Sequence, residues 1–245
     1  MNAARHAAGQ ALAMRATSGR PLQLWWRDDD AVAPSPALDR LLRITETDAP
    51  LTLAVIPAPW DQPPTGTELA ERLADQPHVH VAVHGWSHLD HAAAGAKKQE
   101  LAPHRAVSQM RTELRQGLAM LRDLHGKRAL PLLVPPWNRI ANDLLPHLAQ
   151  DGFTAISTYG PEQPVPGLRV VNTHLDVIDW RGGRIARDPD AMWHELETLA
   201  ASPRNYVGVL THHLVHCGKT WAFLSDLISV VRDYGGEWRG VEDVT

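Results

Sequence analysis

The sequence predicts an α/β fold that closes into a barrel, and two patterns support this prediction. Apolar segments of strand length alternate along the chain with longer segments whose apolar residues recur every three or four positions. Several of the short segments are apolar throughout, which is typical of strands buried on both faces of a parallel sheet. Seven such strands with helices between them favour a barrel, in an irregular form, over an open doubly wound sheet.

The expected elements follow one another without an internal repeat or a linker, so residues 1–245 are expected to form one domain. Residues 1–20 are expected to form a helix or a loose segment. The expected strands cover residues 22–27, 51–56, 79–83, 130–135, 153–157, 168–172 and 206–211. The expected helices cover residues 36–46, 67–74, 97–125, 142–150, 189–201 and 219–234.

Composition excludes several classes of protein. The chain has 24 Lys and Arg against 28 Asp and Glu, a net charge of −4 that does not favour nucleic acid as a partner. No apolar run is long enough to cross a membrane. The single cysteine, Cys217, cannot form an internal disulfide, and the first twenty residues lack the apolar stretch of a secretory signal. We therefore expect a cytoplasmic protein.

Clusters of polar and aromatic residues follow five of the expected strands. Active sites of α/β folds gather at the carboxyl ends of strands, so this placement makes each cluster a candidate site. The clusters are Asp28-Asp29-Asp30, the segment from His84 to His88, Pro135-Pro136-Trp137, Asp176 to Trp180, and Leu210 to His213.

Two of these clusters suggest a metal ion. Three adjacent carboxylates repel one another at the end of an apolar strand, and a cation would offset that cost. His84 and His88 are four residues apart, a spacing that lets two imidazoles meet one ion on a helical turn. The spacing alone is weak evidence, because His80/His84 and His212/His216 share it. Each cluster, taken alone, is as compatible with a structural role as with a functional one.

Taken in order, the five clusters resemble the motifs of the polysaccharide deacetylase family, also called carbohydrate esterase family four. WRDDD is similar to TFDDG, HGWSH to H[ST]xxH and VPPWN to RPPYG, while DVIDW matches DxxDW and LTH matches LxH. The resemblance spans about residues 22–213. It implies an irregular (β/α)7 barrel and a metal-dependent hydrolase that removes N-acetyl or O-acetyl groups from a carbohydrate.

The resemblance also implies roles for single residues. Asp28 is expected to be the general base, and His212 the general acid, held by Asp179. Asp29, His84 and His88 are expected to bind a divalent ion, with zinc preferred and cobalt, nickel or iron as alternatives. The expected substrate-binding residues are Trp137, Trp180, Trp86, Pro136 and Leu210. The expected partner is an acetylated sugar or glycan precursor, and the oligomeric state is open.

Three departures from the motifs bear on catalysis. Asp30 replaces a glycine and Gly85 replaces a serine or threonine, whereas Val134 replaces the arginine that holds the base in the family. We expect Arg139 to take over this task by pairing with Asp28 or Asp30, and Arg27 is the other candidate. If neither does, the alternative is a non-catalytic relative that binds a metal or a sugar.

Overall fold

A computed structural model describes residues 3–244 of the chain, and these residues divide into two compact units. Unit 1 runs to Asp28 and contains Ser35–Thr52 and the chain from Thr173 onward, while unit 2 contains Asp29–Pro34 and Leu53–Asn172. The chain crosses between the units inside the strands β1 (Gln23–Ala31) and β2 (Leu51–Val55). No linker is needed at these crossings inside strands. For this reason the sequence shows no domain boundary and suggests one domain.

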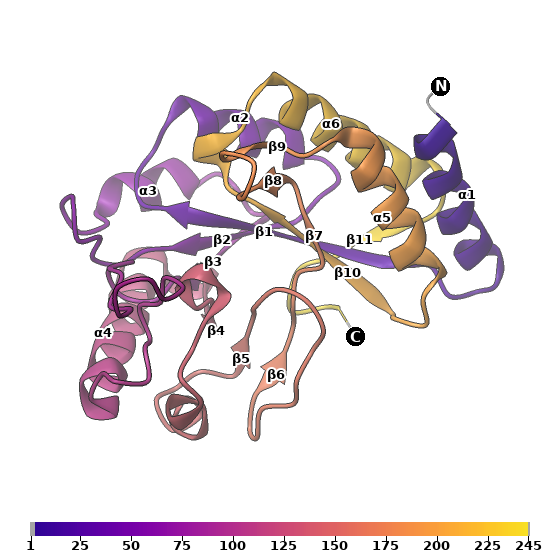
Figure 1. The fold of residues 1–245 in the computed structure, drawn as a ribbon. Coiled ribbons are helices and arrows are strands. Elements are labelled where there is room, and N and C mark those ends of the chain that lie inside the picture. The colour runs from indigo at the N-terminus through magenta and orange to yellow at the C-terminus, as the bar shows by residue number, and fades with distance from the viewer. Residues whose placement is uncertain (1–2, 245) are drawn as a thin grey trace. The chain divides into compact units, whose positions relative to one another are not determined.

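Unit 1 contains a parallel sheet with the strand order β11 (Glu237–Trp238), β1, β10 (Tyr206–Thr211) and β7 (Leu175–Asp176). The register of β1 and β10 pairs Asp28 with Thr211. A small antiparallel hairpin joins β8 (Ile178–Asp179) and β9 (Ile185–Ala186). The helices of this unit are α1 (Ala3–Thr17), α2 (Pro36–Thr45), α5 (Pro189–Ala201) and α6 (Gly218–Asp233), and α1 lies along α5 (Figure 1).

Unit 2 contains the strands β2, β3 (Val79–Val83), β4 (Ala129–Leu133), β5 (Ala155–Ile156) and β6 (Arg169–Val170), in that order. Strands β3 to β6 are parallel. Helix α3 (Thr67–Leu73) follows β2, and α4 (Val107–His125) packs against β3 and β4. The buried face of α4 includes Met110, Leu114, Leu118 and Leu121, at the spacing that predicts an amphipathic helix.

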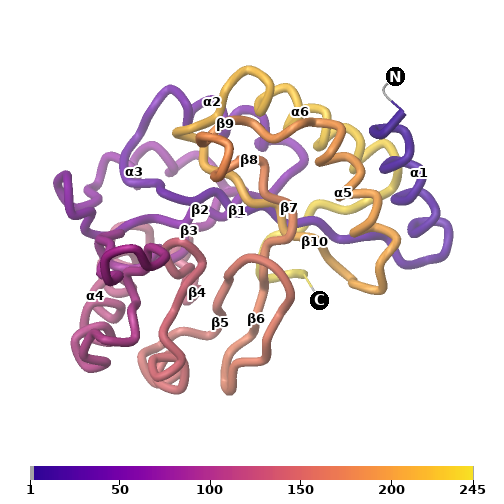
Figure 2. The backbone as a smooth tube through the Cα atoms, viewed as in Figure 1, coloured from indigo at the N-terminus to yellow at the C-terminus, as the bar shows by residue number. Residues whose placement is uncertain are grey.

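All seven expected strands are present, and the α/β fold class with parallel strands is confirmed. The prediction of the longest helix, residues 97–125, is wrong at its start, because α4 begins only at Val107. The chain between β3 and α4 has no helix before that residue and can be followed as a loop in Figure 2. Pro103 disfavours helix in the residue before it. Residues 142–150 form only a 3-10 helix, Asn142–His147, which contains Pro146. Strands β7, β8, β9 and β11 are two residues long and were not expected.

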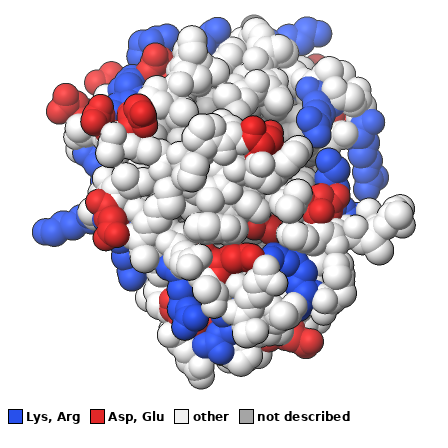
Figure 3. All heavy atoms as spheres, turned by 90° about the vertical axis from the view of Figure 1, so that its left-hand side faces the viewer, with Lys and Arg blue, Asp and Glu red and all other residues white. Residues whose placement is uncertain are grey.

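The surface agrees with the modest net charge. On the face drawn in Figure 3, basic and acidic side chains are interspersed, and neither sign forms a continuous field. None of the helices within residues 3–244 is long and apolar enough to span a bilayer.

Candidate functional site

A group of one carboxylate and two imidazoles in unit 2 can hold a metal ion. Asp30 Oδ1 lies 3.1 Å from His84 Nε2 and 3.3 Å from His88 Nε2. Asp30 is near the end of β1, and His84 directly follows β3. Within residues 3–244 this is the one such group whose three ligand atoms all lie within 4.8 Å of one another. Strand ends thus bring the two expected histidines together with one residue of the acidic run, Asp30.

The hydrogen bond at His84 Nδ1 orients its ring so that Nε2 can bind a metal ion. His84 is buried, and its Nδ1 lies 3.0 Å from the backbone carbonyl of Val134, so the Nδ1–H donates to that oxygen. Nε2 is left to face Asp30 and His88. A histidine that binds a metal commonly donates its other ring N–H to a carbonyl, which fixes tautomer and ring orientation. Val134 lacks the family's arginine side chain, but its backbone positions a ligand.

Electrostatics in this group also suit a cation. Burial lowers the pKa of His84, but the carboxylates of Asp29 and Asp30 outweigh it and raise that pKa. Burial and the neighbouring His84 lower the pKa of His88 to about 4, so this imidazole is neutral at pH 7. A hydrogen bond joins His84 Nε2 to Asp30 Oδ1, and a divalent ion bound by these two atoms would displace its proton. The donor set therefore fits a metal.

The structure replaces Asp29 by Asp30 as the carboxylate of this group. Asp30 has a left-handed backbone, with φ of 71°, and this turn brings its carboxylate toward the two imidazoles. Asp29 is buried and acts on His84 through its charge. Asp30, and not the expected Asp29, is therefore the acid that lies with the two imidazoles. Spacing alone cannot distinguish three adjacent acids.

Glu100 is a residue of this region that the sequence did not indicate. Its carboxylate accepts hydrogen bonds from the backbone N–H groups of Trp86, Ser87 and His88, at 3.0, 2.9 and 3.1 Å. Glu100 is fully buried. The sequence places it inside an expected helix, and only Pro103 argues that this helix begins later.

The loop after β4 supplies an aromatic wall to the imidazoles. The ring of Trp137 lies 4.2 Å from that of His88, and Pro136 is buried beside it. Trp137 has φ of 54°, a conformation that few non-glycine residues adopt. Of the expected substrate-binding residues, Pro136, Trp137 and the half-buried Trp86 thus belong to the same unit as the metal group.

Arg139 does not take the part expected of it. Its Nη1 donates to the backbone carbonyl of Lys98 at 2.7 Å. The guanidinium is therefore used by a neighbouring loop, and the structure gives no support to a pair with Asp28 or Asp30. Arg27, the other candidate, is fully buried in β1.

Asp28, the expected base, is held in a closed network within unit 1. Its Oδ1 lies 2.5 Å from His213 Nδ1, and its Oδ2 accepts from Thr211 Oγ1 at 2.5 Å and from the backbone N–H of His213 at 3.0 Å. Trp26 Nε1 donates to Thr211 Oγ1 at 2.8 Å. Although burial opposes ionisation, His213 lowers the pKa of Asp28. Asp28 is thus an ionised and fully engaged carboxylate.

Three more motif residues of unit 1, His212, Asp179 and Leu210, can be compared with the roles expected of them. His212 and His213 have different neighbours, although both follow the end of β10 and His213 begins a 3-10 helix, and the His212 ring meets Trp180 edge-on at 4.5 Å. Asp179 is not placed as expected, because its Oδ1 accepts from the N–H groups of Arg181 and Gly182 in the hairpin turn. Leu210 is buried in the core, which does not suit a substrate contact.

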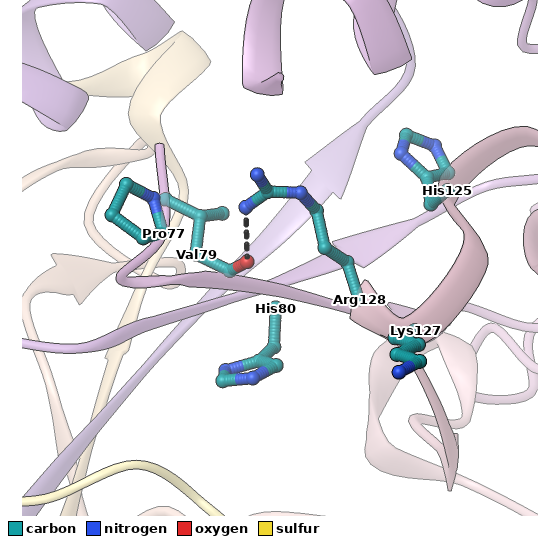
Figure 4. Close-up of a pocket in the computed structure, with 6 residues that line it drawn as sticks. All are labelled: Pro77, Val79, His80, His125, Lys127 and Arg128. Atoms are coloured by element: carbon teal, nitrogen blue, oxygen red, sulfur yellow. Dashed lines mark hydrogen bonds between the residues drawn. The ribbon is translucent and has the colours of Figure 1, made fainter. Parts of the chain in front are cut away.

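One cavity lies away from these residues. It has a volume of about 370 Å³ and lies at the amino ends of β3 and β4, whereas His84 and His88 follow the carboxyl end of β3. In Figure 4 the Arg128 side chain reaches the Val79 carbonyl, which accepts a 3.4 Å hydrogen bond. The cavity is lined by Pro77, Val79, His80, His125, Lys127 and Arg128.

The fold is similar to those of solved carbohydrate deacetylases. A family 4 acetyl xylan esterase from Clostridium thermocellum, solved with a cobalt ion, is 14% identical, with a TM-score of 0.57 over 90% of this chain and 89% of that one. A polysaccharide deacetylase from Bacillus cereus is 16% identical, with a TM-score of 0.56 over 89% and 91%. A chitin deacetylase from the fungus Colletotrichum lindemuthianum is 18% identical, with a TM-score of 0.58 over 90% and 86%.

No family model matches the sequence, and no curated protein matches it. The likeness to solved structures extends over nearly the whole chain at low identity, as expected of a divergent relative. The chain therefore has the fold of the polysaccharide deacetylases, which is the fold that its five motifs predict.

Proposed function

We propose that the chain is a metal-dependent hydrolase that removes acetyl groups from a carbohydrate. The observation that supports this most strongly is the convergence of Asp30 Oδ1, His84 Nε2 and His88 Nε2 in a protein with the deacetylase fold. Two imidazoles and one carboxylate leave coordination positions open on a zinc ion, as catalytic sites require. Zinc is the preferred ion, and cobalt, nickel and iron remain alternatives.

Different residues of the chain are proposed for the separate steps of acetyl hydrolysis. A bound divalent cation lowers the pKa of a water molecule and polarises the acetyl carbonyl. Asp29, buried beside the ligand Asp30, is the proposed acceptor of the water proton, because both oxygens of Asp28 are already engaged. The backbone N–H of Trp137 is the proposed donor to the acetyl oxygen. His212 is the proposed acid that protonates the leaving amine or alcohol.

An assay of acetate release tests the proposal. Protein loaded with zinc should release acetate from at least one member of a panel of N- and O-acetylated sugars, and a chelator should abolish this release. His84→Ala should lose both acetate release and zinc binding. His80→Ala is the matched control, since His80 lies in β3, the strand that His84 follows, but outside the metal group, and it should keep both.

One observation favours a second candidate, a relative that binds a metal or a sugar without catalysis. Val134 stands where the family has an arginine, and Arg139 does not replace that arginine. Zinc binding without acetate release from any sugar would select this candidate.

For the hydrolase, we also propose a cytoplasmic sugar or glycan precursor as the substrate, in keeping with the single cysteine.

A further inference from the structure

The backbone N–H groups of residues 86, 87 and 88 all point to one buried carboxylate. Glu100 Oε1 accepts from Trp86 and Ser87, and Oε2 accepts from His88. A buried carboxylate is costly unless hydrogen bonds replace its water, and three N–H donors do so here. The two partners depend on each other, because without Glu100 these three amides would lose their acceptor.

The conformation of the histidine loop matches this arrangement. Gly85 and His88 both have left-handed backbones, with φ of 62° and 56°. Consecutive amides held in this way form a concave anion-binding surface. A Cβ atom at Gly85 would lie 2.3 Å from Glu100 Oε2 and 2.6 Å from the Pro136 ring. The glycine at this position of the motif thus leaves the space that the carboxylate occupies.

The segment that contains Glu100 is itself fastened on both sides. Arg105 Nη1 donates to the Glu100 carbonyl at 3.3 Å. Arg139 donates to the Lys98 carbonyl, and the N–H of Ala141 donates to the Leu101 carbonyl at 2.8 Å. These bonds hold the Glu100 segment against the chain that follows Trp137, whose ring packs on His88.

We infer that Glu100 is the positioning residue of the metal group. Its carboxylate fixes the loop from Gly85 to His88, so that the Nε2 atoms of His84 and His88 converge on Asp30. Glu100 contributes no ligand atom to this group. The inference rests on the proposed function only in taking His84 and His88 as ligands of a metal.

Zinc affinity of Glu100→Gln tests the inference, measured by competition with a chromogenic chelator. Glutamine keeps the length and volume of the side chain but places an NH₂ group against a backbone N–H. Zinc affinity should fall about 10- to 100-fold, the usual effect of losing a residue that orients a metal ligand. Asp151→Asn is the matched control. Asp151 is also a buried carboxylate of unit 2, bonded by Arg111 at 2.8 and 2.9 Å, and it is absent from the metal group.

Amide hydrogen exchange gives a second measurement that does not need a metal. Glu100→Gln should speed exchange at residues 86–88, whereas Asp151→Asn should leave these amides unchanged although both variants are less stable. Unchanged exchange at residues 86–88 in Glu100→Gln would overturn the inference. So would a loss of zinc affinity of equal size in both variants. If the wild-type protein binds no zinc while exchange responds as expected, the proposed function fails, and what stands is that Glu100 fixes the loop from Gly85 to His88.

Discussion

Each unit of the chain contains a carboxylate beside imidazole, and the two carboxylates differ in their exposure to solvent and in the number of imidazoles beside them. Asp28 in unit 1 is fully buried, and Thr211 and His213 engage both of its oxygens. Asp30 in unit 2 has a side chain that is 33% exposed, and its Oδ1 faces two imidazoles. The first group is a buried hydrogen-bonded pair, whereas the second brings one carboxylate and two imidazoles within reach of a single cation.

The comparison explains why neighbouring aspartates of one motif have different roles. Sequence gives all three acids the same chemistry, but only the surroundings decide which oxygens are free to act. A fully buried, hydrogen-bonded carboxylate stabilises a fold, and a partly exposed carboxylate beside two imidazoles is suited to bind a cation. Substitutions at each group can therefore separate stability from metal binding.

The largest expected effect is on the buried pair. Asp28→Asn removes the charge that holds His213, and breaking a buried pair on one side costs about 3 kcal/mol. The free energy of unfolding should fall by this amount in urea titrations, while zinc affinity should change by less than about twofold. A variant of wild-type stability that no longer binds zinc would make Asp28 a ligand and reverse the comparison.

A third buried imidazole offers an intermediate case, because neither ring nitrogen of His125 makes a hydrogen bond. Burial, with a contribution from Arg128, lowers the pKa of His125 to about 4. Since the unfolded chain protonates this group near pH 6.5, His125 lowers stability as the pH falls from 6.5 towards 4.

His125→Leu should remove this pH dependence. Relative to the wild-type protein, the variant should gain about 2 kcal/mol between pH 7 and pH 5 in urea titrations at the two pH values. If the difference in free energy of unfolding between the wild-type protein and the variant does not change with pH, burial does not keep this imidazole neutral.

The smallest expected effect concerns Arg139. Its exposed hydrogen bond to the Lys98 carbonyl is worth about 1 kcal/mol at most, so Arg139→Met should change the rate of acetate release and the zinc affinity less than about fivefold. If Arg139 instead paired with Asp28 or Asp30, its loss would lower the rate by about 100-fold, which is typical of a positioned charged group. A loss of that size would restore Arg139 as a partner of the acids.

Much of the fold could be predicted because its strands are apolar and its turns have clear signals. The strand at residues 79–83 and the helix at residues 189–201 have the expected bounds. The helix expected at residue 97 begins at Val107, because tertiary contacts hold Glu100 under the histidine loop. No local pattern marks such a long-range contact.

The site was predictable in its residue types but not in its register. His84 and His88 lie together as the motif predicts, while Asp30 replaces Asp29 because its left-handed backbone redirects the end of β1. Asp179 is used by a hairpin whose strands are only two residues long and leave no alternation to detect. Both differences depend on backbone geometry, which spacing along the chain does not reveal.

A crystal structure of the zinc-loaded protein, with anomalous scattering measured at the zinc edge, tests the central claim most directly. The account predicts one ion bound by Asp30 Oδ1, His84 Nε2 and His88 Nε2 at about 2.0–2.2 Å, with Asp28 still bonded to His213. An ion bound by Asp28, or side chains of His84 and His88 that point apart in the presence of zinc, would contradict it.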